Sequence, residues 1–237
     1  MKTKLTFLTL GLMLGVASLA NATIIGFSGL GDSNTAIGLN YASNASSDGT
    51  GYTVSNGSTS NIAVTWGGAS ASATDSSWDI HHSTWFTPIE GQTTGDSTWD
   101  GVSSSPDIAQ LDYGNVTITF TVDSGYALVL NSFDFGQTAE TSGTSSWTLS
   151  LTNSSLTTVW SQTVDFTDGQ VYTISPAFTG EDGETYTLTF NRTAESYSTN
   201  GRLALDNLSF NQVAIPEPST VALFGLAGLG LLRRRRK

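Results

Sequence analysis

Hydrophobic and polar residues alternate with a period of two in many short segments of this chain. In residues 116–122, Val116, Ile118, Phe120 and Val122 share one face, and three threonines share the other. This alternation is typical of a β-strand with one buried face and one wet face. The same pattern predicts strands over residues 61–66, 126–135, 146–151, 159–164, 171–174, 185–191 and 203–210.

Turn-forming pairs separate these short segments. The pairs supply the positive φ angles that tight hairpins need, and they are Asp48-Gly49, Asn56-Gly57, Asp100-Gly101, Asp168-Gly169 and Asp182-Gly183. No window of helical periodicity interrupts residues 23–211. Many short strands with such turns predict an all-β fold, a β-sandwich of jelly-roll type. Residues 67–77 are all Gly, Ala, Ser, Thr or Asp, which predicts a flexible surface loop.

The first residues have the pattern of a secretory signal peptide. Lys2 and Lys4 precede an apolar run over residues 5–17, and small residues follow. Ala20 and Ala22 fit the A-x-A pattern of signal cleavage. Residues 1–22 are therefore predicted to be removed, so that the mature chain begins at Thr23.

The last residues form a second apolar segment. Residues 221–232 are all Val, Ala, Leu, Phe or Gly. The cations that follow are Arg233, Arg234, Arg235, Arg236 and Lys237. A helix starting at residue 219 would be about 21 Å long, against a bilayer core of roughly 30 Å. It spans the membrane if the arginine side chains snorkel or the bilayer thins, which predicts a short transmembrane helix with its basic end in the cytoplasm.

Pro216, Glu217 and Pro218 stand just before this helix. The Pro-Glu-Pro box, the apolar helix and the terminal arginines together resemble the PEP-CTERM sorting signal of Gram-negative bacteria. The resemblance implies that residues 214–237 are cut near the box by an exosortase, a membrane-embedded cysteine transpeptidase. It also implies transient anchoring in the inner membrane and then a place on the cell surface or in the extracellular matrix. An ordinary C-terminal anchor is the alternative.

The region between the two ends, residues 23–213, is predicted to be one secreted β-sandwich domain. Two of its segments resemble strands of carbohydrate-binding-module-like jelly rolls, and they are NSFDFG at residues 131–136 and ALDNLSF at residues 204–210. That resemblance implies a fold and leaves the activity open.

Charge and cysteine content exclude several kinds of partner and site. The predicted mature domain keeps Arg192 and Arg202 against 19 acidic residues, a net charge of −17. Such a surface repels nucleic acid. Cysteine is absent, so the domain has no disulfide, no thiol nucleophile and no thiolate metal site.

Few residues of this chain are suited to catalysis. The histidines are His81 and His82, and adjacent residues in an extended chain point to opposite faces. We expect them in a solvent-facing loop, and a ligand pair completed by Asp79 is the alternative. The sequence has no H-E-x-x-H, G-x-S-x-G or phosphate-binding glycine motif. The prediction is a protein that is not an enzyme, although two-carboxylate glycoside chemistry stays open.

Aromatic and acidic residues gather in residues 75–100. Aromatic rings stack on sugars and carboxylates bind hydroxyl groups, so Trp78, Trp85 and Trp99 are candidate glycan-binding residues. The alternative interpretation is that these rings cap the end of the core, because large aromatic side chains usually bury their area.

Asp206 is the candidate metal ligand. It lies in phase with Leu208 and Phe210, so it points inward if the last strand is regular. A buried carboxylate is paired or bound to a metal. The resemblance to carbohydrate-binding jelly rolls implies a structural calcium here, whereas Arg202 or a backbone donor would serve equally well. No other cofactor is expected.

The sequence supports three hypotheses for the function. The first is an exported, exosortase-sorted surface or matrix protein, structural or adhesive, that associates with extracellular polysaccharide. Its partners are exosortase, the membrane through the C-terminal helix, and polysaccharide. The second is a carbohydrate-binding module. The third is a secreted glycoside-active enzyme, which requires two carboxyl groups facing each other across a cleft.

Overall fold

The computed structural model describes residues 22–30, 35–54, 58–68, 75–82, 107–111, 116–137, 144–167, 171–195 and 203–216. Within these ranges the chain forms fourteen strands in two antiparallel sheets and contains no helix. The all-β fold class and the β-sandwich are therefore confirmed. None of the described ranges offers a helix long and apolar enough to cross a membrane. The predicted signal peptide, apart from Ala22, and the predicted C-terminal helix lie outside them.

The smaller sheet, which we call sheet B, has five strands. Their order is β10 (Thr158–Thr167), β9 (Thr144–Asn153), β13 (Thr185–Glu195), β7 (Val116–Val122) and β4 (Ile62–Gly68). The outer face carries hydroxyl residues in cross-strand register, such as the row Thr65, Thr119, Thr187 and Thr152. Threonine suits this position because it is β-branched and polar, so it fits a pleated surface whose other face is buried.

The larger sheet, sheet A, has nine strands and divides at its centre. The main path is β11 (Val171–Ile174), β8 (Tyr126–Gln137), β14 (Leu203–Ala214), β6 (Asp107–Leu111), β5 (Asp75–His82) and β2 (Thr35–Gly38). β12 (Phe178–Thr179) also pairs with β8, and β1 (Thr23–Ile25) pairs with both β14 and β3 (Tyr52–Val54). β14 therefore has two successive neighbours, β6 and β1, on one of its edges.

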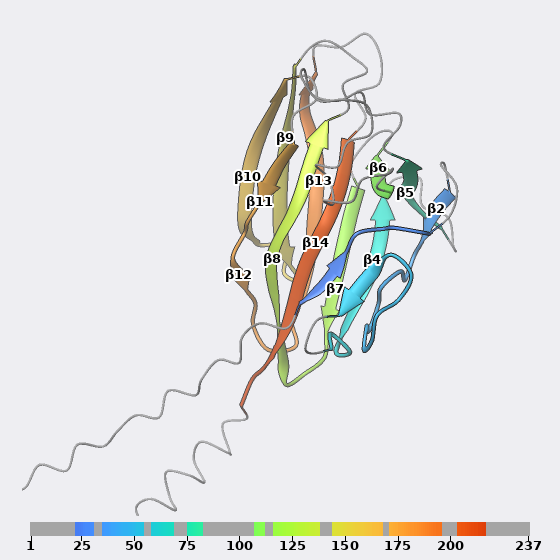
Figure 1. Cartoon of the computed structure of the whole chain (residues 1–237). Coiled ribbons are helices and arrows are strands. Elements are labelled where there is room, and N and C mark those ends of the chain that lie inside the picture. The colour runs from blue at the N-terminus through green and yellow to red at the C-terminus, as the bar shows by residue number, and fades with distance from the viewer. Residues whose placement is uncertain are drawn as a thin grey trace, which may run out of the picture.

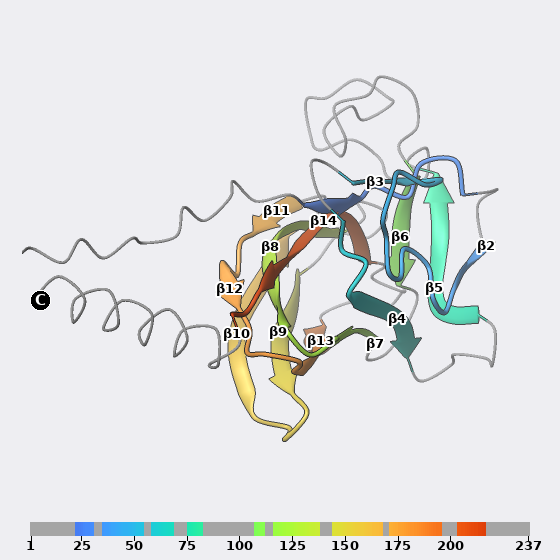
Figure 2. The same cartoon turned by 90° about the horizontal axis from the view of Figure 1, so that it is seen from below.

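The chain crosses repeatedly from one sheet to the other. β7 lies in sheet B, β8 in sheet A and β9 again in sheet B, and the chain crosses between β10 and β11, β12 and β13, and β13 and β14. Figure 1 shows the long strands side by side, and Figure 2 separates the layer of β8 and β14 from that of β9 and β13. Crossings of this kind agree with the jelly-roll type of sandwich.

An aromatic-rich core fills the space between the sheets. Trp66 of β4, Trp78 of β5 and Phe190 of β13 are each 0% exposed. The Trp78 ring meets the other two edge to face, with centroid distances of 5.5 Å to Trp66 and 5.4 Å to Phe190. Each such pair contributes about 0.5–1.5 kcal/mol beyond its area burial. Because Trp78 comes from sheet A and its two partners from sheet B, these contacts join the sheets.

The strands predicted from alternation are all present, but the loop expected between them is shorter. The loop prediction for residues 67–77 is wrong at both ends, since Gly67 and Gly68 belong to β4 and β5 begins at Asp75. The loop expected at His81 and His82 is also wrong. Both residues end β5, where they pair with β6. Strand pairing rather than composition decides the local structure here.

Candidate functional site

Sheet A divides where β14 contains a β-bulge. Residues 203–205 of β14 pair with β6, whereas residues 208–210 pair with β1. Between these two stretches the register with β8 shifts after Asp206. Asn207 has a φ of 50°, a left-handed conformation that Asn adopts more readily than most residues. A bulge bends its strand and changes the direction of the side chains around it.

Asp206 is buried as predicted, with 0% exposure, but the predicted reason is wrong. Leu205 and Leu208 both belong to the main core cluster although they lie three positions apart. The alternation is therefore shifted at the bulge, and Asp206 is not in phase with Leu208 and Phe210. As the neighbour of Leu205 and the cross-strand partner of Asp134, it lies on the outer side of sheet A.

One hydrogen bond lies within the bulge, a second joins the bulge to β8, and a third joins β8 to β11. The Asn207 backbone N–H donates to Asp206 Oδ1 at 2.7 Å, so a backbone donor is present. The Asn207 amide donates to Asp134 Oδ2 at 2.9 Å, and the Thr173 hydroxyl donates to Asp134 Oδ1 at 2.6 Å. Two carboxylates thus lie opposite each other on paired strands, and like charges in this position destabilise a sheet unless a cation compensates them.

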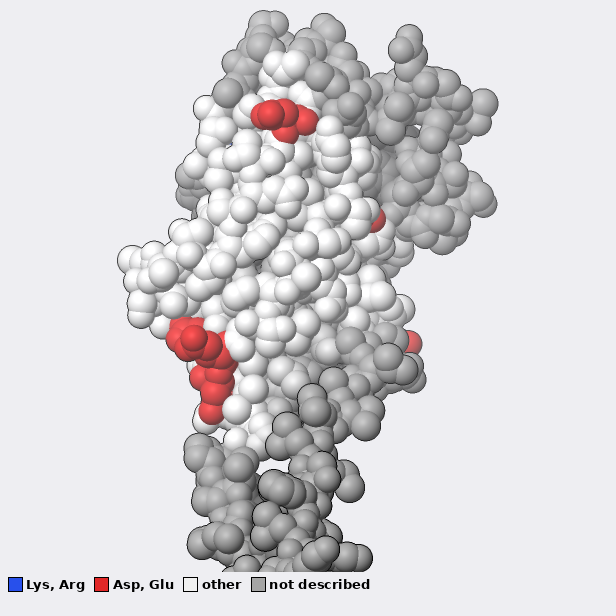
Figure 3. Space-filling model, turned by 90° about the vertical axis from the view of Figure 1, so that its left-hand side faces the viewer, with Lys and Arg blue, Asp and Glu red and all other residues white. Residues whose placement is uncertain are grey.

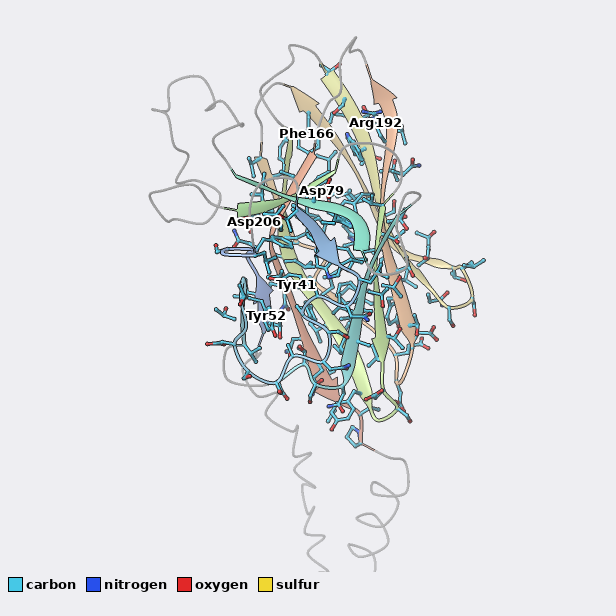
Figure 4. All side chains as sticks on the ribbon, turned by 90° about the vertical axis from the view of Figure 1, so that its right-hand side faces the viewer. Tyr41, Tyr52, Asp79, Phe166, Arg192 and Asp206 are labelled. Atoms are coloured by element: carbon cyan, nitrogen blue, oxygen red, sulfur yellow. The ribbon has the colours of Figure 1, made fainter. Side chains whose placement is uncertain are left out.

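Arginine is not in a position to provide this compensation within the described residues. Arg192 is the only Lys or Arg among them, and its guanidinium lies over the Trp147 ring, 5.8 Å from the centroid. Figure 4 labels Arg192 well away from Asp206. Arg202, the other arginine weighed as a partner, lies outside the described residues.

A groove of about 280 Å³ opens beside the bulge. Its lining residues are Ile24, Gly26, Ser28, Gly49, Gly51, Tyr52, Thr53 and Asn207. A Cβ at Gly26 would lie 3.8 Å from Asp206 Oδ1 and 3.9 Å from Asn207 Oδ1. Glycine therefore leaves a small cradle in front of two side-chain oxygens.

Two residues beside the same groove have a left-handed backbone conformation. Phe27 has a φ of 57° and Gly51 a φ of 74°, and the N–H groups of Gly26 and Phe27 both donate to the Gly51 carbonyl, at 2.9 and 2.8 Å. A Cβ at Gly51 would lie 2.6 Å from the Tyr41 hydroxyl oxygen, so a side chain does not fit there. A non-glycine residue in this conformation costs about 1–3 kcal/mol, and such residues concentrate at functional sites.

Tyr41 lies on the same side of the molecule as Asp206 and Tyr52 (Figure 4). Burial raises the pKa of the Tyr41 phenol well above its usual value, and the charges of Tyr52 and Asp206 raise it further. The phenol therefore stays protonated and donates to the Thr50 carbonyl at 3.0 Å. Tyr41 acts as a fixed hydrogen-bond donor rather than as an acid or base near neutral pH.

The oxygens at the cradle suit a hard cation. Carboxylate, amide and carbonyl oxygens are the ligands of Ca²⁺, and Asp206 and Asn207 present two side-chain oxygens toward Gly26. Across the described ranges, no group of three or more His, Cys, Asp or Glu residues could hold a metal ion. The remaining ligands of a cation would therefore be amide oxygens, backbone carbonyls or water.

Sequence reasoning found Asp206 but missed the residues that surround it. Asn207, Asp134 and Thr173 come from three strands, and only the cross-strand register brings them together. The one local signal was the Asp-Asn pair inside an alternating segment, because Asn tolerates a left-handed conformation. Gly26 carried no signal, since its importance depends on the oxygens opposite it.

The candidate glycan-binding surface does not include Trp78. Its ring is fully buried between the sheets, and its indole N–H donates to the Thr117 carbonyl at 3.4 Å. The core interpretation therefore holds for Trp78, because a ring without exposed area cannot stack on a sugar. Trp85 and Trp99 lie outside the described residues.

The predicted processing residues flank the first and last strands. Ala22 immediately precedes β1, and Pro216 follows the end of β14 and is exposed. The other residues assigned to processing lie outside the described ranges and are Ala20, Glu217, Pro218, Arg233, Arg234, Arg235 and Arg236.

Residues 214–237 match the family model of the PEP-CTERM protein-sorting motif. The resemblance of the tail to this signal is therefore confirmed over all of its three parts. The motif marks the chain as an exported, exosortase-sorted protein that is transiently anchored at the membrane before processing. No curated protein matches the chain.

Several solved structures are similar to parts of this chain. An arabinose-bound MgGH51 α-L-arabinofuranosidase has a TM-score of 0.33 and 12% identity over 62% of this chain and 23% of its own. The module TmCBM61, in complex with β-1,4-galactotriose, has a TM-score of 0.31 and 8% identity over 64% and 88%. A CBM28 module specific for non-crystalline cellulose has a TM-score of 0.30 and 11% identity over 62% and 86%.

These structures include both enzymes and binding modules. The chain spans 23% of the arabinofuranosidase and 20% of a bacteriophage CBA120 tailspike protein, which is 13% identical and has a TM-score of 0.29. The likeness therefore does not separate catalysis from binding.

Proposed function

We propose that this chain is a non-enzymatic component of the bacterial cell surface or extracellular matrix, structural or adhesive, that associates with exopolysaccharide. One observation carries the proposal: the sorting motif begins at residue 214, where β14 ends. Sorting therefore delivers the whole sandwich to the outside of the cell.

The outer surface of the sandwich supports an association with a neutral, hydrated polymer. Hydroxyl residues cover the outer face of sheet B, as in the paired residues Thr117 and Thr189 or Thr119 and Thr187. Figure 3 shows a broad uncharged area between acidic patches, with no Lys or Arg among the described residues in view. Hydroxyl groups exchange hydrogen bonds with water and sugar alike, so this surface solvates the protein without repelling a polysaccharide.

The arrangement of the carboxylates supports the non-enzymatic part of the proposal. Asp134 and Asp206 are carboxylates that the register of β14 and β8 places opposite each other, so they are the pair to weigh for a two-carboxylate mechanism. However, Asp206 is fully buried, and hydrogen bonds from Asn207 and Thr173 occupy oxygens of both groups. A glycosidic bond has no access to both carboxylates in this arrangement. Glycoside-hydrolysing activity that is lost in Asp134→Asn would contradict the proposal.

We also propose that the cradle beside Gly26 binds calcium. Asp206 and Asn207 supply side-chain oxygens, and the ion would offset the charge of two carboxylates on paired strands. Its role would be structural, because it would join the segment after β1 to the bulge of β14.

Replacing the five terminal cations by serine tests the sorting role. The variant changes Arg233, Arg234, Arg235, Arg236 and Lys237, and we expect weaker membrane retention and slower removal of the tail because the basic cluster holds the helix end in the cytoplasm. Membrane fractionation and the mass of the released protein measure both effects. Arg202→Ser is the matched control, which removes a cation outside the motif. Unchanged retention and processing of the five-residue variant would contradict the proposal.

Carbohydrate binding through Trp85 or Trp99 is the alternative, and a glycan array separates it from a structural role. Wild-type binding that disappears in Trp85→Ala or Trp99→Ala would favour the alternative. Trp78→Ala is unsuitable for this comparison, because it removes a core ring.

A further inference from the structure

β14 leads directly into the sorting motif. Only Ile215 separates Ala214, the last residue of β14, from Pro216, the first residue of the Pro-Glu-Pro box. The Ile215 N–H donates to the Gly125 carbonyl at 2.8 Å, so this residue is also held by the sandwich. In Figure 1, β14 ends at the lower end of the molecule. The box therefore begins at the surface of the folded domain.

Two turns hold this exit in place. We call residues 123–125, 180–184 and 214–216 together the base of the sandwich. The Gly125 N–H donates to Asp182 Oδ1 at 2.6 Å, and the Gly183 N–H donates to the Tyr126 carbonyl at 2.9 Å. The turn at residues 123–125 is thus bonded both to the turn at residues 180–184 and to Ile215, so the exit of β14 is held against the domain and is not a free linker.

The short distance from the base to the box limits how a protease can bind. A stretched chain covers about 3.3–3.6 Å per residue, so the box lies within about 10 Å of Ile215. A single helix with its side chains is already about 10–12 Å thick. A protein that encloses the box in an active site must therefore extend to the base. Release of Ala214 and Ile215 from their hydrogen bonds would add only about 7 Å.

We propose that exosortase contacts the base of the sandwich while it cuts this chain, so that the folded domain is part of the recognised substrate. The inference rests on the proposed sorting role. It adds a surface and a partner that the motif alone does not require, since a sorting motif on a long linker would be cut without any such contact.

The side chains at the base define the chemistry of the partner surface. Asp123, Glu181 and Asp182 are exposed at the two turns, and the described residues of the base include no Lys or Arg. Figure 3 shows an acidic patch toward the lower end of this side of the molecule. Because like charges across an interface weaken association, the surface that fits the base is polar and carries cations.

Charge reversal at the base, with and without a spacer, tests the inference. Asp123→Lys and Glu181→Lys are made in the full chain, and tail removal is followed by pulse-chase and intact mass in a host that contains an exosortase. We expect each reversal to slow processing several-fold, because it places a cation against a cationic surface. Insertion of ten Gly and Ser residues between Ile215 and Pro216 should abolish this difference. Asp123 and Glu181 are both exposed, and the melting temperatures of the released domains verify that the variants fold.

Asp165→Lys is the matched control, since Asp165 is an exposed carboxylate of β10 opposite Ser146 and away from the base. It should leave the processing rate unchanged. The inference is overturned if the base variants are processed at the wild-type rate, or if they are slowed equally with and without the spacer. Retention of the tail by the wild-type chain in the same host would overturn the sorting role as well, which separates the two failures.

Discussion

Sheet B and the divided part of sheet A are built in opposite ways. β13 pairs with β7 from Thr185 to Phe190 without a shift, and its outer face is neutral and rich in hydroxyl groups. β14 in sheet A changes partner from β6 to β1, contains a bulge, and buries Asp206. Regular alternation thus stabilises the sandwich. The interruption in β14 brings side-chain oxygens and a left-handed residue to the edge of a groove.

Stability and the candidate ligand site lie in different regions of this fold. A buried carboxylate and left-handed non-glycine residues both cost free energy. Asp206 is buried beside the groove, where Phe27 and Asn207 are two of the left-handed residues. Sheet B carries no such features in its central strands. Mutations should therefore act on folding in sheet B and on ligand response at the bulge.

The largest effect is expected in the core shared by the two sheets. Phe190→Ala should lower the free energy of unfolding by about 3–5 kcal/mol, because it removes a fully buried ring that contacts Trp78, Phe133 and Phe135. Denaturant unfolding measures the change. Thr189→Ala, the next residue on the outer face, is the control and should change the free energy by less than about 0.5 kcal/mol. If the two variants lowered the free energy of unfolding equally, sheet B would not have one buried face and one solvent-exposed face.

The second effect concerns the response to calcium. Calcium at 100 times its Kd should stabilise the wild-type domain by about 2.7 kcal/mol, and Asp206→Asn should lose this response while it remains folded in EDTA. Thermal unfolding with and without calcium measures it. Asp165→Asn on sheet B should keep the full response. A wild-type domain that does not respond, or an Asp206→Asn variant that responds fully, would contradict the calcium proposal.

The third effect tests the backbone of the bulge. Asn207→Ala should destabilise the domain by about 1–2 kcal/mol, because alanine tolerates the left-handed conformation poorly. Asn207→Gly should destabilise it less, since glycine adopts a positive φ without strain. Asn191→Ala in β13 is the comparison in sheet B. Both variants lack the amide contact to Asp134, so an Asn207→Gly variant that is no more stable than Asn207→Ala would contradict the assignment of backbone strain to this residue.

The smallest effect is expected at the edge of the base. Hydrogen bonds from the Ser154 side chain and backbone lower the pKa of Glu184 below its ordinary value of 4.5. The stabilisation is therefore fully present above pH 4.5 and is lost as the pH falls through the lower pKa of the folded state. Between pH 6 and pH 3, the free energy of unfolding should fall less with decreasing pH in Glu184→Gln than in the wild type, as measured by denaturant unfolding at each pH. An unchanged pH dependence would contradict this assignment.

The sequence predicted the regular strands well because a half-buried strand must alternate. β7 and β11 have the predicted bounds, and the longer strands extend the predicted segments by a few residues. The short strands β1, β2, β3 and β12 have two to four residues, too few for a pattern. β5 was missed because its polar residues and the Gly/Ser/Ala run before it outweighed the alternation of Trp78 and Ile80.

The candidate site was less predictable than the fold. Alternation gave the burial of Asp206 but the wrong direction for its side chain, because a bulge adds a residue that no period-two pattern contains. The partners Asp134 and Thr173 depend on strand order, which the sequence did not reveal. The sorting motif, in contrast, was complete in the sequence, since its recognition depends on consecutive residues.

The intact mass of the mature protein, isolated from its own host, tests the central claim most directly. The account predicts a molecule outside the cell that lacks the signal peptide before Thr23 and ends near Pro216 to Pro218, because an exosortase removes the apolar segment and the arginines. A mass that still includes Arg233 to Lys237 in the extracellular protein would contradict it.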